Sequence, residues 1–395
     1  MTKLKLFTEY CTGCGLCKSV RGTTFNVNDK GYIEPILNKK DEAFCAKVCP
    51  ASGHALKKYQ DGTIWGTYKS CNLGWSADEK IRKGSSSGGV LTSICCYLLE
   101  KGIVDGIIQT RRANDDIRKT ETVISYTKED VMSCMGSRYT TSSPLMNFVE
   151  LLREGKKYAF VGKPCDVSAL RIFMNEENQK IQEMIKYLFS FFCAGMPSID
   201  ANNRLVKALG GERLSDCKDL QYRGNGWPGY ATLTMKDGSK QQMDYETSWM
   251  TILGRDVRKI CRFCADGTGE LADISCGDAW YLGCNGKPDF TERPGRNVIF
   301  ARTEAGASLL RETELAGCVD LETFDPNKDQ LRKIQPYHYT RKASLIVYKW
   351  ALRACGRVCP NYDNKKLRYF AKGFPLKQKA FRFIGTVKRV LKGKI

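Results

Sequence analysis

Residues 11–17 read Cys11-Thr-Gly-Cys14-Gly-Leu-Cys17 and carry three thiols at C-x2-C-x2-C spacing. The two glycines let the backbone curl tightly, so that the three sulfurs converge. Bacterial ferredoxins hold three corners of a [4Fe–4S] cube with this spacing. Zinc ribbons also begin with C-x2-C, but tetrahedral zinc usually takes its ligands as two separated pairs. The run therefore predicts an iron–sulfur cluster in a ferredoxin-like module over residues 1–60.

A fourth thiolate is needed to complete such a cube, and it is usually a remote Cys followed by Pro. Cys49-Pro50 has this context, because the proline ends backbone pairing and keeps the thiolate turned inward. Cys45 stands four residues earlier and is the competing candidate. The ligands predicted for this cluster are Cys11, Cys14, Cys17 and Cys49.

The composition predicts an intracellular protein of two or three domains. A chain of 395 residues is long enough for a large core, and no run approaches the apolar length of a membrane span. The N-terminus lacks the apolar stretch of a signal peptide, so we expect a cytoplasmic location. In such a chain 19 cysteines beside only 2 histidines indicate metal binding rather than disulfides.

The net charge of +20 is compatible with nucleic acid, an acidic partner protein or anionic lipid. The charge is uneven, because residues 364–395 hold eleven Lys or Arg and no Asp or Glu. This tail supplies over half of the basic excess. Since the excess lies outside the part of the chain that carries the motifs, the distribution argues against a nucleic-acid enzyme.

Apolar runs at 103–108, 123–126, 157–161, 187–192 and 297–301 are typical of buried strands. Polar loops with small residues and then helical stretches follow several of them. This alternation predicts an α/β domain over residues 61–305, with its functional loops on one edge of the sheet. The stretch 210–300 is richer in Gly and more β-like, whereas 306–395 is expected to be helical with a basic tail.

A Gly/Ser loop, Gly84-Ser-Ser-Ser-Gly88-Gly89, leads into an apolar helix predicted over 90–99. Backbone N–H groups at the positive end of a helix suit a phosphate or pyrophosphate group. The loop fits neither G-x-G-x-x-G nor the Walker form, so taken alone it could equally be a flexible linker.

An ordered set of motifs resembles the beta subunits of coenzyme F420 hydrogenase and dehydrogenase, a family of flavin and iron–sulfur proteins. The motifs are CTGCGLC at 11–17, SSSGG at 85–89, MGSRYTTS at 135–142, VGKPCDVSALR at 161–171, FFCAGMPS at 191–198, CRFCAD at 261–266 and ADISCGDAW at 272–280. Together they span residues 11–285, about two thirds of the chain, and leave out the basic tail.

The resemblance implies FAD held by the Gly/Ser loops, with [4Fe–4S] clusters that exchange single electrons with it. Three positions depart from the family pattern: Arg138 stands where lysine is frequent, Lys163 where threonine is frequent, and Cys276 at an aromatic position. The FAD contacts carried over by the resemblance are Ser86, Ser87, Gly88, Gly89, Ser137, Arg138, Tyr139, Gly162, Lys163 and Pro164.

A second cluster follows when the resemblance is combined with the number of ligands required. Cys261-x2-Cys264 gives two thiolates on one turn, while Cys165 and Cys193 each follow a predicted strand. Adjacent parallel strands would bring the latter two together and complete a set of four. The alternative is that these two are small buried hydrophobic residues. Cys355-x3-Cys359-Pro360 echoes a ligand motif, but two thiols alone cannot hold a cube.

These observations predict an oxidoreductase that passes electrons between a ferredoxin-like partner, [4Fe–4S] clusters, FAD and an organic substrate. No protein acid or base is required at the flavin, so no catalytic side chain is assigned. The second hypothesis is an electron-transfer subunit docked to a hydrogenase or dehydrogenase, with no substrate of its own. The sequence does not identify the substrate.

The tail predicts a basic amphipathic helix that begins near Lys377. Phe381, Ile384, Val387 and Leu391 recur at spacings of three and four and form one apolar stripe flanked by Lys and Arg. Such a helix can pack on the body or on a partner subunit. It can also make a weak, salt-sensitive contact with an anionic membrane.

Overall fold

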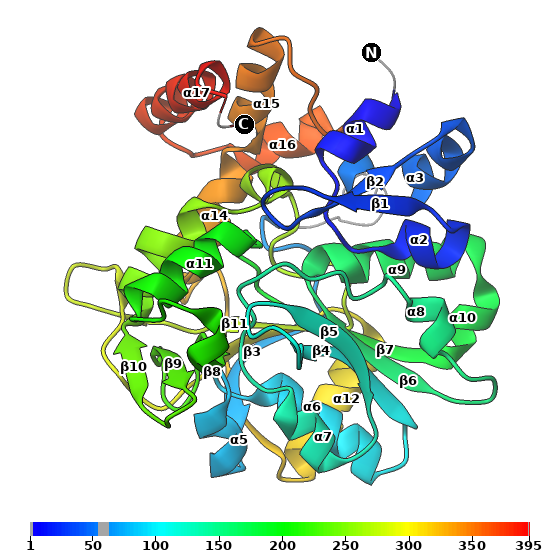
Figure 1. Ribbon diagram of the computed structural model, residues 1–395, viewed down its shortest axis with the longest axis vertical. Helices are drawn as coiled ribbons and strands as arrows, with labels where there is room; N and C mark the ends of the chain where they lie inside the picture. The colour runs from blue at the N-terminus through cyan, green and yellow to red at the C-terminus, as the bar shows by residue number, and fades with distance from the viewer. Residues whose placement is uncertain (1–2, 54–62, 394) are drawn as a thin grey trace.

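The computed structural model describes residues 3–53, 63–393 and 395, and its centre is an eight-stranded mixed sheet (Figure 1). Residues 54–60 of the expected N-terminal module lie outside the described part. The strand order is β15 (Val319–Thr323), β3 (Ser70–Ser76), β14 (Asn297–Ala301), β11 (Ile274–Asp278), β7 (Ile185–Phe191), β6 (Tyr158–Gly162), β4 (Gly106–Arg112) and β5 (Thr120–Ser125).

Strands β11, β7, β6 and β4 run parallel to one another, and the four outer strands pair antiparallel. Parallel strands require helical crossovers, which confirms the predicted α/β class. The sheet also reaches past the predicted domain boundary at residue 305, because β15 pairs with β3. Pairing between distant strands of this kind is not visible in local composition.

Both faces of the sheet are buried under helices. Ile108 and Leu188 pack into a core with helices on one face, whereas their neighbours Ile107 and Phe189 pack on the opposite face. Successive residues of a strand point to opposite faces of the sheet, so each apolar strand contributes side chains to both cores. Burial of each such side chain contributes about 1.5–3 kcal/mol. The covering helices are α9 (Pro164–Glu177) and α10 (Gln179–Met184) on the first face, and α6 (Val90–Glu100) and α12 (Glu304–Leu315) on the second.

A smaller three-stranded antiparallel sheet packs against α11 (Ile199–Ala208), as the β-like character of 210–300 predicted. Its strands are β8 (Cys217–Gln221), β9 (Ala231–Met235) and β10 (Lys240–Met243). The turn between β9 and β10 places Gly238 at φ 90°, which a glycine adopts readily.

The N-terminal and C-terminal regions share one hydrophobic core. Phe7 and Tyr10 pack in the same cluster as Leu352 and Leu367, and Figure 1 shows the two regions side by side at one end of the molecule. The N-terminal elements are α1 (Lys3–Glu9), α2 (Leu16–Arg21), the hairpin β1 (Thr24–Val27) and β2 (Ile33–Ile36), and α3 (Glu42–Val48). The C-terminal helices are α14 (Pro336–Ala343), α15 (Leu345–Ala354), α16 (Asn364–Phe370) and α17 (Leu376–Leu391).

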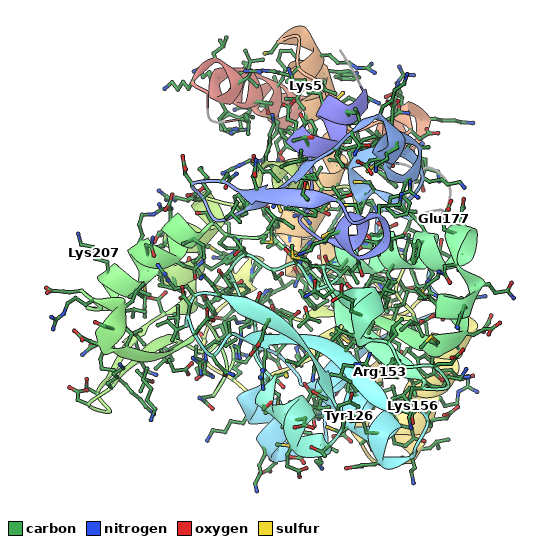
Figure 2. The ribbon with its side chains drawn as sticks, turned by 45° about the vertical axis from the view of Figure 1, so that its right-hand side comes forward. Lys5, Tyr126, Arg153, Lys156, Glu177 and Lys207 are labelled. Atoms are coloured by element: carbon green, nitrogen blue, oxygen red, sulfur yellow. The ribbon has the colours of Figure 1, made fainter. Side chains whose placement is uncertain are left out.

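The remaining elements are short. They are α5 (Glu79–Gly84), α7 (Lys128–Ser133), α8 (Phe148–Leu151), α13 (Leu331–Ile334), β12 (Tyr281–Leu282) and β13 (Pro288–Asp289). Charged side chains such as Lys5, Lys156 and Lys207 project from the surface (Figure 2). No helix in the described ranges has the length and apolar character needed to span a bilayer.

Candidate cofactor sites

The predicted N-terminal cysteines lie close to one another, and Cys45 lies with them. The pKa of Cys14 is raised to about 11, mainly by burial and then by the Asp166 carboxylate, with a smaller contribution from the neighbouring Cys11. Burial also raises the pKa of Cys49, followed by the effects of Cys45, Cys11 and Cys14. Burial raises the pKa of Cys17 as well, followed by the effects of Cys14, Cys11 and Cys45. We call Cys11, Cys14, Cys17, Cys45 and Cys49 the first cysteine set.

The turn that carries the first set depends on its glycines. Gly13 and Gly15 have φ values of 77° and 89°, and a Cβ at Gly15 would lie 2.7 Å from the backbone of Met146. The Gly13 N–H donates to the Cys11 sulfur at 3.3 Å. The sequence prediction of a tight turn is therefore confirmed, and the close approach of Met146 adds a second reason for glycine at position 15.

Arg258, remote in sequence, anchors this turn. Its Nε donates to the Cys11 carbonyl at 2.6 Å, and a second nitrogen donates to the Ile33 carbonyl. Its Nη1 is buried and has no hydrogen-bond partner among the described residues. This nitrogen would lie 2.9 Å from a Cβ on Gly13. A buried cation with an unused donor therefore faces the cysteine turn, where an anionic group would satisfy it.

The four cysteines predicted for a second cluster also come together. Cys165 lies in the first turn of α9 rather than at the end of a strand, and Cys193 follows β7. Since β6 and β7 are parallel neighbours, the segments after them meet at one sheet edge. Burial raises the pKa of Cys193 to about 11, with Cys261 the next cause, and that of Cys264 to about 12. We call Cys165, Cys193, Cys261 and Cys264 the second cysteine set.

Arg341 of α14 closes one side of the second set. Its guanidinium donates to the carbonyls of Cys193 at 3.0 Å and Ala194 at 3.3 Å. Its charge acts to lower the pKa of both Cys193 and Cys264 against the effect of burial. Each cysteine set therefore has a buried arginine beside it, and a cationic neighbour stabilises thiolates.

The two sets are neighbours in space. A small hollow of about 40 Å³ lies between them and is lined by Thr12 and Pro50 from the first region and by Cys165 and Cys264 from the second. Within the described residues, no three His, Cys, Asp or Glu side chains are placed to hold a single metal ion. In a cube each thiolate binds a different iron, so its ligands stand further apart than those around one ion.

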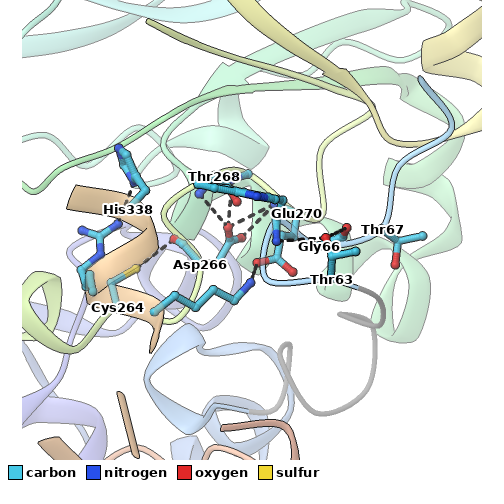
Figure 3. Close-up of polar contacts among 12 residues, drawn as sticks. Thr63, Gly66, Thr67, Cys264, Asp266, Thr268, Glu270 and His338 are labelled. Carbon is cyan, nitrogen blue, oxygen red and sulfur yellow. Dashed lines mark hydrogen bonds and ion pairs between the residues drawn. The ribbon is translucent and has the colours of Figure 1, made fainter. Parts of the chain in front are cut away.

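A buried polar network fixes the loop after Cys264 (Figure 3). The Asp266 carboxylate accepts three backbone N–H donors, from Thr268, Gly269 and Glu270, at 2.8–3.2 Å. Glu270 forms a buried ion pair with Lys342. A buried pair of this kind adds little net stability, but the loss of one partner is costly. The network therefore holds the loop that carries Cys261 and Cys264 in one position.

A larger hollow of about 270 Å³ lies at the carboxyl ends of the parallel strands, where α/β folds usually bind ligands. The Ser137 N–H donates to the Ser86 hydroxyl at 2.6 Å, so two of the predicted loops meet directly. Eight of the ten predicted FAD contacts line this hollow: Ser86, Ser87, Gly89, Ser137, Arg138, Tyr139, Gly162 and Lys163. Below, "the main hollow" means this site.

The other two predicted contacts, Gly88 and Pro164, do not line the main hollow. A Cβ at Gly88 would lie 2.7 Å from the Asn297 side chain and 2.8 Å from the Gly74 carbonyl. Close packing of the loop on β3 and β14 is therefore one reason for a glycine at this position. Pro164 opens α9, at a position where a helix tolerates proline.

Two of the cations that line the main hollow stand at the positions that depart from the family pattern. The Nε of Arg138 is buried and has no partner in the described part of the chain, and burial lowers its pKa. Lys163 bonds to Asp166 at 2.8 Å and to the Ser142 hydroxyl at 2.7 Å. Burial acts to lower the pKa of Lys163, but the Asp166 carboxylate and then the Cys165 thiol raise this pKa above its usual value. Lys163 thus stays charged between the main hollow and the second cysteine set.

Sequence reasoning missed several lining residues. Arg223 is buried and forms a two-armed pair with Asp278 at 3.0 Å for each bond. Trp249 packs on Tyr139 with ring centroids 4.7 Å apart. Asp278 lies within a motif that supported the resemblance, but nothing local in the sequence connects it with Arg223, 55 residues away.

The fold and the site define an α/β protein with two cysteine sets next to a ligand hollow. Residues 71–150 match the family model "Coenzyme F420 hydrogenase/dehydrogenase, beta subunit N-term", and residues 155–327 match the companion model for the carboxyl-terminal part of the same beta subunit. The chain belongs to this family, which confirms the resemblance. The second cysteine set and the main hollow lie within the matched ranges, whereas Cys11–Cys49 precede both.

Relatives with curated names are subunits or longer forms of oxidoreductases. The chain is 26% identical to coenzyme F420 hydrogenase subunit beta of Methanococcus voltae, over 70% of this chain and 92% of that protein. It is also 26% identical to the coenzyme F420-dependent sulfite reductase of Methanocaldococcus jannaschii, over 80% of this chain and 48% of that protein. At this coarse level the chain is a member of an oxidoreductase family.

A solved structure shares the fold. It is a chain of the F420-reducing nickel–iron hydrogenase complex of Methanosarcina barkeri, with a TM-score of 0.57 and 22% identity. The match covers 76% of this chain and 98% of that chain.

Proposed function

We propose that this protein is a flavin and iron–sulfur oxidoreductase in which two clusters lead to FAD. The observation that carries the proposal is the contiguity of three sites. The small hollow is lined by Thr12 and Pro50, which adjoin cysteines of the first set, and by Cys165 and Cys264 of the second set. Cys193 of the second set and Lys163 also line the main hollow. Electrons could therefore pass from the first set to the second set and on to the main hollow, with an organic substrate at its open side.

The residues of the main hollow fit a flavin dinucleotide. Arg138 offers an unused buried donor to a pyrophosphate, and the loop at Ser86 and Ser87 leads into the N-terminus of α6. The volume of about 270 Å³ is just below the range for cofactor sites, roughly 300–1,000 Å³. FAD would therefore also extend beyond the hollow. Bound FAD would supply two-electron exchange with the substrate and one-electron exchange with a cluster.

The cysteine sets fit two [4Fe–4S] clusters. Each provides four thiols under the predicted assignment, and each has a buried arginine, Arg258 or Arg341, to balance the negative charge of the thiolates. The C-x2-C-x2-C sequence spacing of Cys11, Cys14 and Cys17 supports a cube over the zinc alternative, because tetrahedral zinc usually takes its ligands as two separated pairs. Cys45 and Cys49 both lie near Cys11 and Cys14, so the Cys-Pro context remains the reason to prefer Cys49 as the fourth ligand.

A second candidate function is an electron-transfer subunit without its own substrate, and the names of the relatives favour it. The Methanococcus voltae relative is called a subunit and is matched over 92% of its length. The donor would then be a partner subunit rather than a free ferredoxin-like protein. Turnover of an organic acceptor by the isolated chain with reduced viologen supports the first candidate. Turnover only after addition of a partner complex supports the second.

Substitution of Arg138 with methionine is expected to weaken FAD binding about tenfold to a hundredfold, because a hydrogen bond to a charged group contributes roughly 1.5–3 kcal/mol. Fluorescence titration of flavin-depleted protein with FAD measures this change. Arg111→Met is the matched control and should bind FAD normally. It removes a partly exposed ion pair between Arg111 on β4 and Glu121 on β5. Unchanged affinity in Arg138→Met would mean that the guanidinium only shapes its own loop through the Ser137 and Met135 carbonyls.

A further inference from the structure

Helix α17 packs on the body with one side only. Thr386 and Val390 are buried, and Val390 joins the core that α17 shares with α15, with Phe383 packed against it. These three positions recur at spacings of three and four, so they form one face of the helix. The helix continues unbroken through Gly385 from Leu376 to Leu391.

A second side of α17 is apolar and exposed. Leu376 is 81% exposed, Phe381 73%, Ile384 53% and Leu391 78%. Three of the four residues in the predicted stripe are among them, so the alternative that this stripe packs on the body is wrong. Single exposed apolar residues are common, but a line of them along one helix marks an interaction surface. We call these four residues the outer stripe.

Basic side chains stand among and beside the residues of the outer stripe, because Lys377 is one turn before Phe381 and Lys388 is one turn after Ile384. Lys377, Lys388 and Lys392 are exposed, and residues 364–395 contain no Asp or Glu to neutralise them. Long lysine side chains can lie along an apolar surface and place their charge at its edge. The surface is thus complementary to one that combines negative charge with an adjoining apolar layer.

We propose that α17 docks this protein on the surface of an anionic lipid membrane. An interfacial helix of this kind buries its apolar side to a depth of about 5–10 Å, and its lysines meet the headgroups. The helix has 16 residues and is about 24 Å long, and it lies at one extremity of the molecule, where a plane can reach it (Figure 1). The same end carries α1 and the β1–β2 hairpin, so docking would bring the first cysteine set toward the membrane.

Binding of the full-length, cofactor-loaded chain to vesicles tests the proposal. The chain should co-sediment with phosphatidylglycerol-containing vesicles at low salt, but not with neutral phosphatidylcholine vesicles or at high salt. Lys377→Gln combined with Lys388→Gln should weaken binding about twenty-five-fold, from about fivefold for each lysine. The charge-matched control, Lys156→Gln with Lys207→Gln at distant exposed sites, should bind like the wild type (Figure 2).

The apolar part of the surface has its own matched control. Phe381→Ser with Ile384→Ser should abolish co-sedimentation, whereas Leu315→Ser, at an 82% exposed leucine on α12, should not change it. Unchanged iron and flavin content shows that each variant is folded, and it keeps this test separate from the proposed cofactors. Equal binding by wild type and the α17 variants overturns the proposal. A chain that binds no vesicles but forms a dimer, which Phe381→Ser dissociates, also overturns the proposal. The outer stripe would then hold a second copy of the chain.

Discussion

Replacement of Cys14 with serine is expected to remove about half of the iron, leaving roughly four atoms per chain and bound FAD, because each complete set holds one four-iron cube. Cys14 is buried on the turn between Gly13 and Gly15, and a serine hydroxyl is a weaker iron ligand than a thiolate. Iron and acid-labile sulfide assays on anaerobically purified protein measure the change.

Cys217→Ser provides the control for Cys14→Ser. Cys217 is also buried, but it is the first residue of β8 in the three-stranded sheet and belongs to a different hydrophobic core. Its replacement should leave all of the iron in place. Parallel variants Cys45→Ser and Cys49→Ser decide between the two candidates for the fourth ligand, because only the true ligand costs the cluster. A full complement of iron in Cys14→Ser would contradict the predicted ligand set.

Replacement of Cys264 with serine is expected to remove the other half of the iron and, with it, reduction of FAD by a one-electron donor. Cys193 of the second set lines the main hollow, and Cys165 and Cys264 line the small hollow beside the first set, so loss of this cluster removes the proposed relay to the flavin. Anaerobic stopped-flow mixing with reduced viologen, followed at the flavin absorbance, measures this transfer.

Cys276→Ser is the control for Cys264→Ser, because Cys276 lines the main hollow but belongs to neither set. It should retain both iron and rapid flavin reduction. Flavin reduction at the wild-type rate in Cys264→Ser would show that electrons reach FAD without the second set. In that case Cys165 and Cys193 would be buried hydrophobic residues, as the alternative interpretation of the sequence held.

The parts of the site that the sequence predicted are those with a local signal. The tight turn at 11–17 follows from the spacing of its cysteines and glycines, and the fold reproduces it through the left-handed backbone at Gly13 and Gly15. The meeting of Cys165 and Cys193 follows from two apolar runs that form adjacent parallel strands. Short-range pattern and strand order were sufficient in both cases.

The parts that the sequence did not predict depend on contacts between distant residues. Arg258 reaches Cys11 across 247 positions, and Arg341 reaches Cys193 across 148. Gly88 packs against the Asn297 side chain and the Gly74 carbonyl, which its own loop sequence does not reveal. A lone arginine or glycine has no periodicity that reveals such a partner. The amphipathic pattern of α17 likewise could not show which of its apolar sides would remain exposed.

The cofactor content of the wild-type chain tests most directly the proposal that two clusters lead to FAD. Protein purified without oxygen should contain about eight iron atoms and eight sulfides, as two cubes require, together with one FAD. Iron is measured by plasma emission, sulfide colorimetrically, and flavin after release by acid. About four iron atoms per chain would contradict the second cluster, and zinc in place of iron would contradict both.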